Sequence, residues 1–521
     1  MAEFLPLLRS TADLQQWLRV HAASGLHLVP TMGALHHGHQ ALIASARAAA
    51  GSSSRPVLVS VFVNPLQFGP AEDFDRYPRQ LQADAALAHQ AGASALWAPD
   101  PAAIYPRGVA GVTQLEPAPE LVRELCGPRR PGHFAGVCTV VARLLALAKP
   151  SHLHLGEKDW QQLQVLRRLV ADLGLPLQVI PFPSQREHDG LPSSSRNAYL
   201  SAAERQQAAA LPLALSQAAA LLRRGERAAS ALVAAAQAVL EDHQLQVEYL
   251  QLVDPQQLQP LGSVQGLALL AAAVRCGTAR LIDHRVLMTR LPILAIDGPA
   301  GAGKSTVTRR VAAALGLTFL DTGAMYRAVT WLVQQRGLQA EASPALDQQL
   351  AELDLRFEPN PEGEQRVLVN GEDVTAVIRT ATVTAGVSAV AAVPAVRQAL
   401  TTQQQRMGQS GGLVAEGRDI GTAVFPDAEL KVFLTATVAE RARRRAADLQ
   451  QRGLPVPDLA QLEQEIAERD HQDSSREVAP LRQADDAVEL LSDGLSIDQV
   501  VERILELFRE RVPLEALSAD A

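Results

Sequence analysis

The sequence is poor in cysteine, and its cysteines do not form a motif. Cys126, Cys138 and Cys276 are the only three, and they lie far apart. The chain therefore has neither the spacing of a zinc site nor the cysteine density of a disulfide-stabilised secreted domain. No secretory signal peptide is recognisable at its start either. These features lead us to expect a protein of a reducing compartment, the cytoplasm.

The sequence also lacks long apolar runs and an excess of positive charge. No apolar stretch approaches the roughly eighteen residues that a membrane-spanning helix needs, and the net charge is −8. We therefore expect no membrane partner and no nucleic-acid partner, while local basic pockets for phosphates remain compatible with this charge. The 521 residues are 47% apolar and 20% charged, which is typical of a globular protein with two to four domains.

The most informative stretch is ILAIDGPAGAGKST, residues 293–306. Its apolar start predicts a buried strand, the residues after it predict a helix, and G-x-x-x-x-G-K-S lies between them. In such a loop backbone N–H groups converge on a phosphate, Lys304 reaches the outer phosphates, and the Ser305 hydroxyl can bind Mg²⁺. A glycine-rich turn with a chance lysine is the alternative. The predicted ATP-binding residues are Gly298, Gly301, Gly303, Lys304, Ser305 and Thr306.

A second strand–turn–helix pattern lies near the start of the chain, in residues 27–50. His36 and His39 of its H-x-G-H sequence fall on the first helical turn, where imidazoles can contact an α-phosphate or a leaving pyrophosphate. Gly38 lets a phosphate chain approach the backbone. A histidine with a pKa near neutrality could also protonate a leaving group. Taken alone, the pattern fits a pair of solvated histidines equally well.

Later segments place polar groups at the ends of predicted strands. One strand ends at Asn64 and Gln67, and ligands bind at the carboxyl edge of parallel α/β sheets. Another is followed by Lys158 and Asp159, which fit a phosphate cation and a ribose or metal partner, or else an exposed turn. A polar loop adds a second phosphate-binding set, Ser194, Ser195 and Arg196.

Through these motifs, residues 1–289 resemble the pantothenate synthetase (pantoate–β-alanine ligase) family. The collinear matches are PTMGALHHGH, FVNPLQF, RPGHFAGVCTVV, GEKDWQQ, SSRN, YLQLVDPQQL and TARLID. The resemblance implies an α/β fold, with a Rossmann-like nucleotidyltransferase domain in residues 1–189 and a small α+β subdomain in residues 190–289 that covers the site. It also implies two steps. ATP and pantoate give pantoyl adenylate and pyrophosphate, and β-alanine then displaces AMP to give pantothenate.

The resemblance also implies roles for individual residues. His36 and His39 would contact the ATP phosphates, with His39 as the proton donor and Lys158 as a third catalytic residue. Gln67, Gln162 and Asn64 would bind pantoate, Gln67 also β-alanine, and Asp159 is a candidate metal ligand. The residues that line ATP would be Met32, Gly33, His36, Gly38, His39, Gly156, Glu157, Lys158, Asp159, Gln185, Ser193, Ser194, Ser195 and Arg196. The family often dimerises, so a homodimer through this half is a further expectation.

Arginines and aspartates are the informative residues after the P-loop. Thr322 and Arg327 fall on a predicted strand-to-helix turn, where the arginine can bind an acceptor phosphate. A phosphoryl group in transfer needs its charge compensated, and guanidinium groups suit that task. For most of the RARRR segment (residues 441–445) we expect instead a solvated helix face. Residues 366–375 predict a β-hairpin around Asn370-Gly371.

Residues 292–512 resemble the cytidylate kinase (CMP/dCMP kinase) family through AIDGPAGAGKST, LDTGAMYR, AEGRDIGT and the run RD-x-x-D-S-x-R followed by APL. This implies an α/β P-loop nucleoside monophosphate kinase, with an acceptor insert around residues 366–397 and a lid around residues 454–476. CMP or dCMP would be phosphorylated by ATP and Mg²⁺. Lys304 and Arg469 would act in catalysis, Arg469 from the lid. The substrate-binding residues would be Thr322, Arg327, Arg397, Arg418, Asp419, Asp473 and Arg476.

The sequence thus predicts two fused enzymes with separate sites, a very short linker near residues 288–292, and a loose tail at residues 513–521. Three alternatives remain open at this point. The first half could be another H-x-G-H nucleotidyltransferase, the second half another nucleoside monophosphate kinase, and either half a degenerate nucleotide-binding module.

Overall fold

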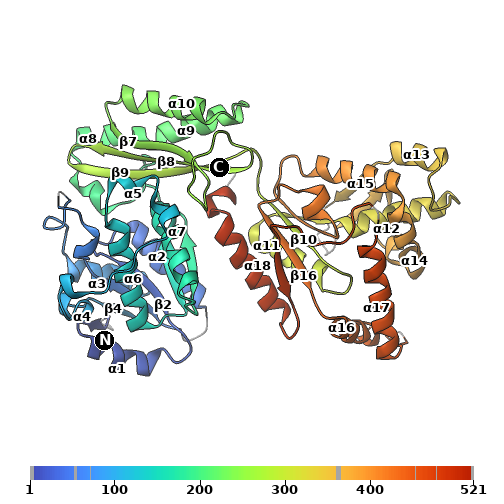
Figure 1. Cartoon of the computed structure of the whole chain (residues 1–521), viewed down its shortest axis with the longest axis horizontal. Coiled ribbons are helices and arrows are strands. Elements are labelled where there is room, and N and C mark those ends of the chain that lie inside the picture. The colour runs from blue at the N-terminus through green and yellow to red at the C-terminus, as the bar shows by residue number, and fades with distance from the viewer. Residues whose placement is uncertain are drawn as a thin grey trace. The chain divides into compact units, whose positions relative to one another are not determined.

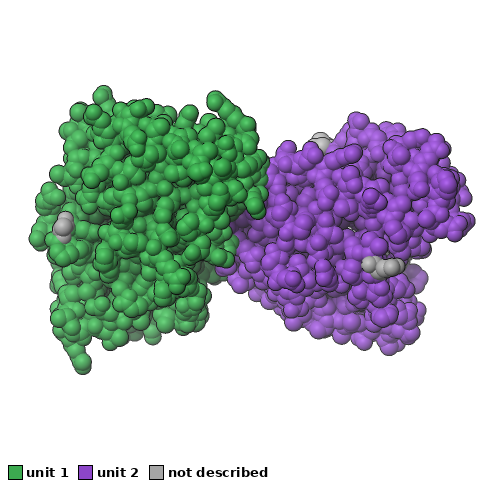
Figure 2. All heavy atoms as spheres, turned by 45° about the horizontal axis from the view of Figure 1, so that its top comes forward, with its two compact units in different colours: residues 1–289, 513–521 green, residues 290–512 purple. Residues whose placement is uncertain are grey.

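The computed structural model describes residues 5–51, 55–70, 72–358, 365–451, 453, 455–476 and 478–517. Leu454, at the start of the expected lid, therefore lies outside the described residues. The chain forms two compact units (Figure 2). Unit 1 contains Met1–Thr289 and Pro513–Ala521, and unit 2 contains Arg290–Val512.

Unit 1 begins with a six-stranded parallel sheet in the order β1-β4-β3-β2-β5-β6 (Figure 1). The strands are Leu7–Leu8, His27–Thr31, Val57–Val61, Ala95–Trp97, His152–Gly156 and Gln178–Phe182 for β1 to β6. The helices are α1 (Thr11–His21), α2 (His37–Ala50), α3 (Leu81–Gln90), α4 (Pro101–Ile104), α5 (Cys126–Arg129), α6 (His133–Ala148) and α7 (Trp160–Asp172). Because helices cover both faces of such a sheet, its central strands are apolar, and Val57, Leu58 and Val59 are fully buried.

The rest of unit 1 is a smaller α+β region. Its antiparallel sheet contains β7 (Gln246–Val253), β8 (Leu267–Cys276) and β9 (Ala279–Met288). The helices are α8 (Ala202–Ala208), α9 (Ala210–Arg223) and α10 (Ala229–Asp242). Figure 1 shows α9 and α10 on one face of this sheet, where alanine and leucine side chains form a common core. The opposite face of the sheet is left for the site described below.

Unit 2 is built on a five-stranded parallel sheet in the order β11-β15-β10-β16-β17. These strands are β10 (Ile293–Asp297), β11 (Thr318–Asp321), β15 (Leu413–Gly417), β16 (Leu430–Thr435) and β17 (Val488–Leu491). The helices are α11 (Lys304–Leu315), α12 (Thr322–Gln335), α13 (Pro344–Ala351), α14 (Ala381–Ala392), α15 (Pro394–Met407), α16 (Val438–Gln451), α17 (Leu459–Ser474) and α18 (Ile497–Arg511). The predicted P-loop strand is β10, the central strand, so its loop opens at the middle of the carboxyl edge.

The predicted hairpin is present in an insert of unit 2. Strands β12 (Leu355–Glu358), β13 (Arg366–Val369) and β14 (Glu372–Asp373) form a small antiparallel sheet. Asn370 and Gly371, between β13 and β14, have φ angles of +50° and +85°. Two consecutive left-handed residues are what a type I′ hairpin turn requires.

The end of the described chain differs from the expected loose tail. Residues Leu514–Leu517 form a 3₁₀ turn, η8, that belongs to unit 1. Ala516 is fully buried, and the Leu514 N–H donates a hydrogen bond to Glu157 Oε1 at 3.1 Å. Residues 518–521 lie outside the described residues. The composition of this segment gave no sign of these contacts because its partners are more than two hundred residues away.

Among the described residues, no single helix is long and apolar enough to cross a membrane. One bent pair, α14 and α15, meets the criteria of length and composition together, with an angle of 95° at the break. The break falls at Val393, because the residue before a proline disfavours the helical region.

Candidate active sites

The turn that follows β2 in unit 1 is held by a buried carboxylate from another helix. Asp84 of α3 accepts hydrogen bonds from the backbone N–H groups of Leu35, at 2.8 Å, and Ala34, at 3.2 Å. Gly33 has a φ angle of +85°, and a Cβ there would lie 3.0 Å from Asp84 Oδ2. Asp84 could not be identified from the sequence because it belongs to no motif. Its role follows only from the fold, in which it is 1% exposed.

The two predicted histidines form the N-terminus of α2. His36 is the N-cap, and its Nδ1 accepts the Gly38 N–H at 3.2 Å. The His36 N–H in turn donates to Nδ1 of His39 at 3.4 Å. Because Nδ1 of His39 is an acceptor, its ring proton is on Nε2, the nitrogen free to donate to an anion. The pair therefore presents donors at a helix N-terminus, as anion binding requires.

Both histidines are neutral in the ligand-free protein. Burial, with the nearby Lys158 charge, lowers the pKa of His36 to about 4. Burial, with the charge of His36, lowers the pKa of His39 to about 3. This corrects the expectation of a histidine with a pKa near neutrality. His39 can act as a proton donor only after a bound polyanion raises its pKa.

Gly38 lies where a side chain would be tightly packed against its neighbours. A Cβ at this position would be 3.1 Å from His36 Cε1 and 3.3 Å from Ser193 Cβ. The glycine therefore permits the close approach between α2 and the Ser193 loop, whereas the sequence predicted only that a phosphate chain could approach its backbone.

A cavity of about 260 Å³ lies at this carboxyl edge of the sheet. Of the predicted residues it is lined by Met32, His36, Gly38, His39, Gln67, Gly156, Lys158, Asp159, Gln162, Gln185, Ser193, Ser194, Ser195 and Arg196. Gly33, Asn64 and Glu157 do not line it. Residues from five separate segments thus meet in one place, although nothing in their spacing predicted that they would.

Asn64 supports the cavity from behind. Its side chain is 1% exposed, and its Nδ2 donates to Gln67 Oε1 at 3.1 Å and to the Gly136 carbonyl at 3.0 Å. Its Oδ1 accepts the Tyr105 hydroxyl at 2.7 Å. The structure therefore places Asn64 as a residue that orients Gln67, whereas the sequence predicted direct substrate contact.

Arg130 and His133 line the cavity but were not singled out in the sequence. Arg130 forms a two-point ion pair with Glu72, at 2.7 and 2.6 Å, and its Nη1 lies 2.9 Å from Nε2 of His133. His133 Nδ1 donates to the Gln67 carbonyl at 2.8 Å, so its Nε2 is the acceptor for Arg130. Both belong to the RPGHFAGVCTVV run, which contributed to the family resemblance without indicating a role for either residue.

The predicted phosphate-binding cations of unit 1 are already paired with carboxylates. Arg196 binds Asp73 through two hydrogen bonds of 3.1 and 2.9 Å. Lys158 Nζ lies 3.9 Å from Asp159 Oδ1. Burial raises the pKa of Asp159, but the positive charges of Lys158, Arg196 and Arg130 outweigh burial and hold that pKa below its usual value. Asp159 therefore lies in a cationic setting that fits a counter-ion better than a metal ligand.

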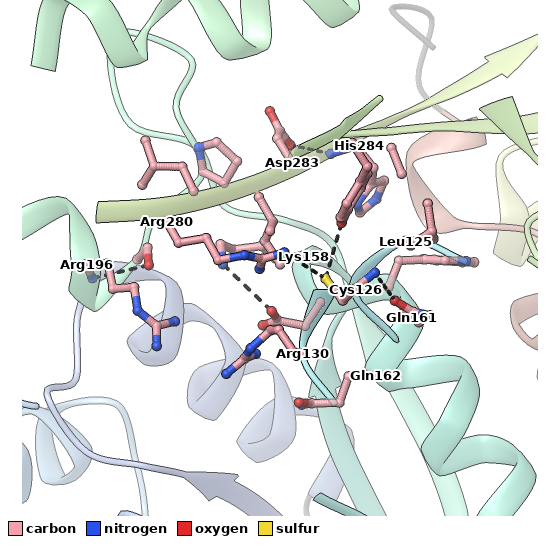
Figure 3. A pocket seen from close by; sticks show the side chains of 18 of the residues that line it. Leu125, Cys126, Arg130, Lys158, Gln161, Gln162, Arg196, Arg280, Asp283 and His284 are labelled. Carbon is pink, nitrogen blue, oxygen red and sulfur yellow. Dashed lines mark hydrogen bonds and ion pairs between the residues drawn. The ribbon is translucent and has the colours of Figure 1, made fainter. Parts of the chain in front are cut away.

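A second cavity adjoins the first and is lined partly by the smaller region of unit 1 (Figure 3). Arg280 and His284 of β9 face Lys158, Gln162 and Arg196 across it, whereas Asp283 points to the other side of the strand and pairs with Arg186. Cys126 Sγ lies 3.3 Å from the Tyr249 hydroxyl and 3.5 Å from Arg280 Nη2. The two cavities share Arg130, His133, Lys158, Asp159, Gln162, Ser194 and Arg196. The open face of the small sheet thus encloses the site, the arrangement the sequence led us to expect.

The P-loop of unit 2 has the predicted geometry. Gly301 and Gly303 have φ angles of +79° and +84°. Gly298 has a φ angle of +149°, and a Cβ there would lie 2.0 Å from the Leu434 carbonyl oxygen. Only glycine fits these positions, and the loop therefore turns its N–H groups inward ahead of α11.

Lys304 is folded over its own loop. Its Nζ donates to the carbonyl oxygens of Gly298 and Pro299, both at 2.8 Å, and the residue is 7% exposed. Burial, with the charge of Arg418, lowers the pKa of Lys304. A bound phosphate would reverse both effects by offering the ammonium a direct counter-charge.

Ser305 faces a carboxylate that sequence reasoning missed. Its hydroxyl donates to Glu416 Oε1 at 2.7 Å, and Glu416 of β15 is 5% exposed. Within the described part of the chain, Glu416 Oε2 has no hydrogen-bond partner. Burial raises the pKa of Glu416. A hydroxyl and a spare carboxylate oxygen are the ligand types that Mg²⁺ prefers, so these residues fit the expected ion.

The predicted acceptor residues of unit 2 are held by ion pairs and a hydrogen bond, and only the Arg397–Asp419 pair is fully buried. Arg397 of α15 pairs with Asp419, and its guanidinium carbon lies 5.5 Å from the centre of the Tyr326 ring. Arg327 Nη2 donates to Asp321 Oδ2 at 3.1 Å. The Thr322 hydroxyl donates to the Glu416 carbonyl at 2.6 Å. These pairs hold polar groups in fixed directions around one space.

Asp473 joins the two predicted phosphate arginines of the lid side. Arg418 Nε donates to Asp473 Oδ2 at 3.0 Å, and Arg476 pairs with the other carboxylate oxygen. Arg469 lies among Arg418, Arg445 and Arg476, and burial, with the Arg418 charge, lowers its pKa. So many cations gathered around one carboxylate leave a net positive charge, which an anion would neutralise.

Arg441 departs from the expectation of a solvated RARRR face. It is 3% exposed, donates to the Ala300 carbonyl of the P-loop at 3.1 Å and pairs with Asp470 of α17 at 2.9 and 2.5 Å. It therefore links the P-loop to the lid helix. Arg443 is exposed, as expected for most of the segment.

One cavity of about 400 Å³ brings the unit 2 residues together. Its lining includes Gly301, Gly303, Lys304, Ser305, Thr306, Thr322, Arg327, Arg397, Arg418, Asp419, Arg469, Asp473 and Arg476. Gly298 of the predicted set does not line it. Tyr326, Thr384, Ser388 and Glu416 line it as well, without having been assigned from the sequence.

Comparison with known proteins gives matches over both units. A family model described as pantoate-beta-alanine ligase matches residues 6–286, and one described as cytidylate kinase matches residues 294–510. A protein of Synechococcus sp. (strain RCC307) named bifunctional pantoate ligase/cytidylate kinase is 70% identical, covering 99% of this chain and 100% of its own. A protein of the same name from Prochlorococcus marinus (strain MIT 9313) is 59% identical, covering 96% and 99%.

A solved structure matches the first of these regions. The crystal structure of pantothenate synthetase from Thermus thermophilus is 41% identical, with a TM-score of 0.51. The match covers 54% of this chain and 99% of that one.

Proposed function

The chain belongs to the family of bifunctional pantoate ligase/cytidylate kinases, and on that premise we propose which residues carry each of its two reactions. The protein is an enzyme with both activities. Its first region is a pantoate–β-alanine ligase, and its second is a cytidylate kinase. The domain limits we propose are residues 1–189, 190–289 and 292–512, with the described residues after Val512 belonging to the ligase unit.

In the ligase, ATP occupies the cavity at the carboxyl edge of the six-stranded sheet. The pantoate carboxylate, oriented by Gln67 and Gln162, attacks the α-phosphorus of ATP. A new carboxylate–phosphorus bond forms as the bond to pyrophosphate breaks. His36 and His39 donate hydrogen bonds to the phosphates, and Lys158 and Arg196 compensate the charge that develops there. What carries this proposal is the neutral histidine pair, with its free Nε2–H, at the N-terminus of α2.

The second ligase step needs shielding more than a nucleophile. The β-alanine amine attacks the acyl carbon, AMP leaves from that carbon, and the amine proton passes to solvent or phosphate. Water would hydrolyse the acyl adenylate, so an enclosed site favours amide formation. The β9 face, with Arg280 and His284, supports this role because it closes the site opposite Lys158.

In the kinase, Lys304 and the P-loop N–H groups hold the ATP phosphates. Arg327, Arg418 and Arg476 bind the phosphate of the acceptor, and Arg469 compensates the charge of the transferring group. The base contacts Thr322, Arg397 and Asp419, and the ribose contacts Asp473. What carries this proposal is the lining of one cavity by all of these side chains. Ser305 and Glu416 would hold Mg²⁺, which neutralises phosphate charge when it is bound.

Two product assays test both functions on one sample. ATP with pantoate and β-alanine should give pantothenate, AMP and pyrophosphate, and ATP with CMP should give ADP and CDP. Pyrophosphate exchange that does not depend on pantoate would contradict the ligase assignment. A preference for UMP or AMP as acceptor would contradict the kinase assignment.

Two further expectations have their own measurements. A cytoplasmic location is supported by Cys126, Cys138 and Cys276, which are all free and buried, and fractionation of cells would test it. A homodimer through the ligase unit stays a prediction that sedimentation equilibrium would decide.

A further inference from the structure

The returning segment, Pro513–Leu517, lies behind both loops that carry the ligase ATP cavity. It follows α18 of unit 2 in the sequence, yet it belongs to unit 1. Pro513 and Ala516 are buried in it, as a docked segment requires. No motif and no part of the proposed mechanism accounts for these contacts.

The first contact is with the loop that follows β5. The Leu514 N–H donates to Glu157 Oε1 at 3.1 Å, and Glu157 is 0% exposed. This is the one hydrogen bond recorded for that carboxylate in the described part of the chain, and its Oε2 has no partner there. Burial raises the pKa of Glu157 to about 7, and the Leu514 N–H opposes that rise. Without Leu514, the Glu157 carboxyl group would have no hydrogen-bond partner among the described residues, and only the charge of Arg167 would oppose the effect of its burial.

The second contact is with the loop that follows β6. Glu515 Oε1 lies 3.9 Å from Arg186 Nη2. Arg186 also makes a two-point ion pair with Asp283 of β9, at 2.8 and 3.1 Å, and donates to the Gly190 carbonyl. Burial raises the pKa of Glu515, while the charges of Arg186 and Arg285 oppose that rise. Glu515 thus completes a charge cluster that fixes the direction of the loop.

In both loops the contacted residue is next in sequence to residues that line the cavity. Gly156 and Lys158 line it, whereas Glu157 between them does not. Ser184 and Gln185 line it, whereas Arg186 does not. Each loop therefore presents one side to the nucleotide and the other to the returning segment. Because they share a backbone, a shift of Glu157 also moves Lys158, and a shift of Arg186 also moves Gln185.

We propose that the returning segment is a positioning element of the ligase active site, so that ATP binding in unit 1 depends on residues encoded after the kinase. This rests on the proposed ATP site. Leu514 and Glu515 do not touch the substrate. They hold Glu157 and Arg186, and through them Lys158 and Gln185.

The test uses two variants that keep both enzymes on one chain. A chain ended after Val512 loses both contacts, and the ATP KM of pantothenate formation should rise about tenfold, with kcat changed far less. The milder variant Glu515→Gln loses one charge and should raise that KM about threefold. Glu502→Gln, the same change at an exposed position of α18, is the matched control and should leave it unchanged.

The kinase reaction serves as the internal reference. The KM values for ATP and CMP in CDP formation should be unaltered in every variant. An unchanged ligase KM for ATP in both variants, even with a lowered melting temperature, would overturn the proposal, because it would show support of folding alone. An equal rise in the kinase KM would overturn it too. Failure of the unaltered chain to form pantothenate would instead reject the ligase function itself.

Discussion

The two proposed sites present different side chains to the same polyanion. In unit 1 the helix that faces the cavity begins with neutral imidazoles, His36 and His39. In unit 2 the corresponding helix begins with a lysine, Lys304, and the cavity is lined by arginines. The ligase cleaves ATP at the α-phosphorus, where donors without charge suffice beside Lys158. The kinase transfers a terminal phosphoryl group, whose three oxygens need more positive charge.

A common feature underlies this difference. In both units the arginines are already paired with carboxylates, Arg196 with Asp73 and Arg418 with Asp473. A pair of this kind fixes a flexible side chain before the ligand arrives, so less conformational freedom is lost on binding. Fixed orientation of the arginines is therefore shared by the two sites, whereas the type of donor follows the bond that is broken.

The largest effect should come from mild acid, which acts on the two units in opposite directions. Burial lowers the pKa of His133 and His284 to about 4 and that of His154 to about 3, all in unit 1. The folded state resists protonating them, so the stability they provide is present above pH 6.5 and is lost as pH falls towards 4. At pH 5 the loss is roughly 2 kcal/mol for each histidine.

Unit 2 should respond with the opposite sign. Its only histidine, His471, is exposed, and burial raises the pKa of Asp297 to about 6. The folded state binds that proton more tightly than the unfolded state does, so unit 2 gains stability as pH falls from 6 towards 4. Calorimetry at pH 7 and pH 5, with residual activities to identify each transition, checks this. In unit 1, protonation of Glu157 offsets the stability lost through only about one of the histidines. A melting temperature that falls for the kinase unit before it falls for the ligase unit would therefore contradict the prediction.

Replacement of the two lysines should separate the activities by the next largest factor. Lys304→Ala removes the ammonium that meets the outer phosphates, and the kcat of CDP formation should fall about 10²–10³-fold. Lys158→Ala should lower pantothenate formation by a similar factor. Each variant should leave the other reaction within about twofold. Loss of both activities in either variant would show that the sites are not independent.

A smaller effect should follow from the buried carboxylates that fix one turn in each site. Asp84 accepts two backbone N–H groups in unit 1, and Asp297 accepts those of Ile420 and Gly421, at 2.8 and 2.7 Å, in unit 2. An asparagine would turn its NH₂ group towards one of the two backbone N–H groups, so that hydrogen bond would be lost and two donors would face each other. Asp84→Asn and Asp297→Asn should each lower the free energy of unfolding of their own unit by about 1–3 kcal/mol.

Exposed aspartates provide the controls for urea unfolding of these variants. Asp75 in unit 1 and Asp485 in unit 2 are exposed. Asp75→Asn and Asp485→Asn should therefore change the free energy of unfolding by less than about 0.5 kcal/mol. If Asp297→Asn destabilised the ligase unit instead, the division of the chain into two independent units would be wrong.

The smallest effect concerns recognition of the acceptor base. The Thr322 hydroxyl donates to the Glu416 carbonyl and lines the unit 2 cavity. Thr322→Val removes one neutral hydrogen bond, so the KM for CMP should rise about fivefold. Thr322→Ser keeps the hydroxyl and should change it by less than about twofold. Steady-state kinetics with CMP checks both, and equal effects of the two variants would exclude a role of the hydroxyl.

The parts of this molecule that could be predicted were those fixed by local backbone geometry. The P-loop needs glycine where φ is positive, so Gly301, Gly303 and Lys304 were readable from the sequence. The same holds for His36 at the start of α2 and for the Asn370-Gly371 turn. The two families, both activities and both folds followed from such segments taken in their order.

Contacts between distant segments could not be predicted. The Ser305–Glu416 pair, the orienting role of Asn64 and the burial of Arg441 all depend on side chains that only the fold brings together. The neutral state of His39 depends on its surroundings for the same reason, since an isolated histidine titrates near neutrality. A motif names the residue type, and the tertiary environment sets its charge.

The division of unit 1 into two chain segments has a consequence for its synthesis. A ribosome completes residues 1–289 first and then makes the roughly 220 residues of unit 2 before Pro513 emerges. At about 5–20 residues per second this is an interval of about 10 to 45 s. During that time the ligase fold can form, but Glu157 stays without the Leu514 N–H. The nascent ligase is thus finished only when the kinase has left the ribosome, which ties the maturation of the first enzyme to complete translation of the second.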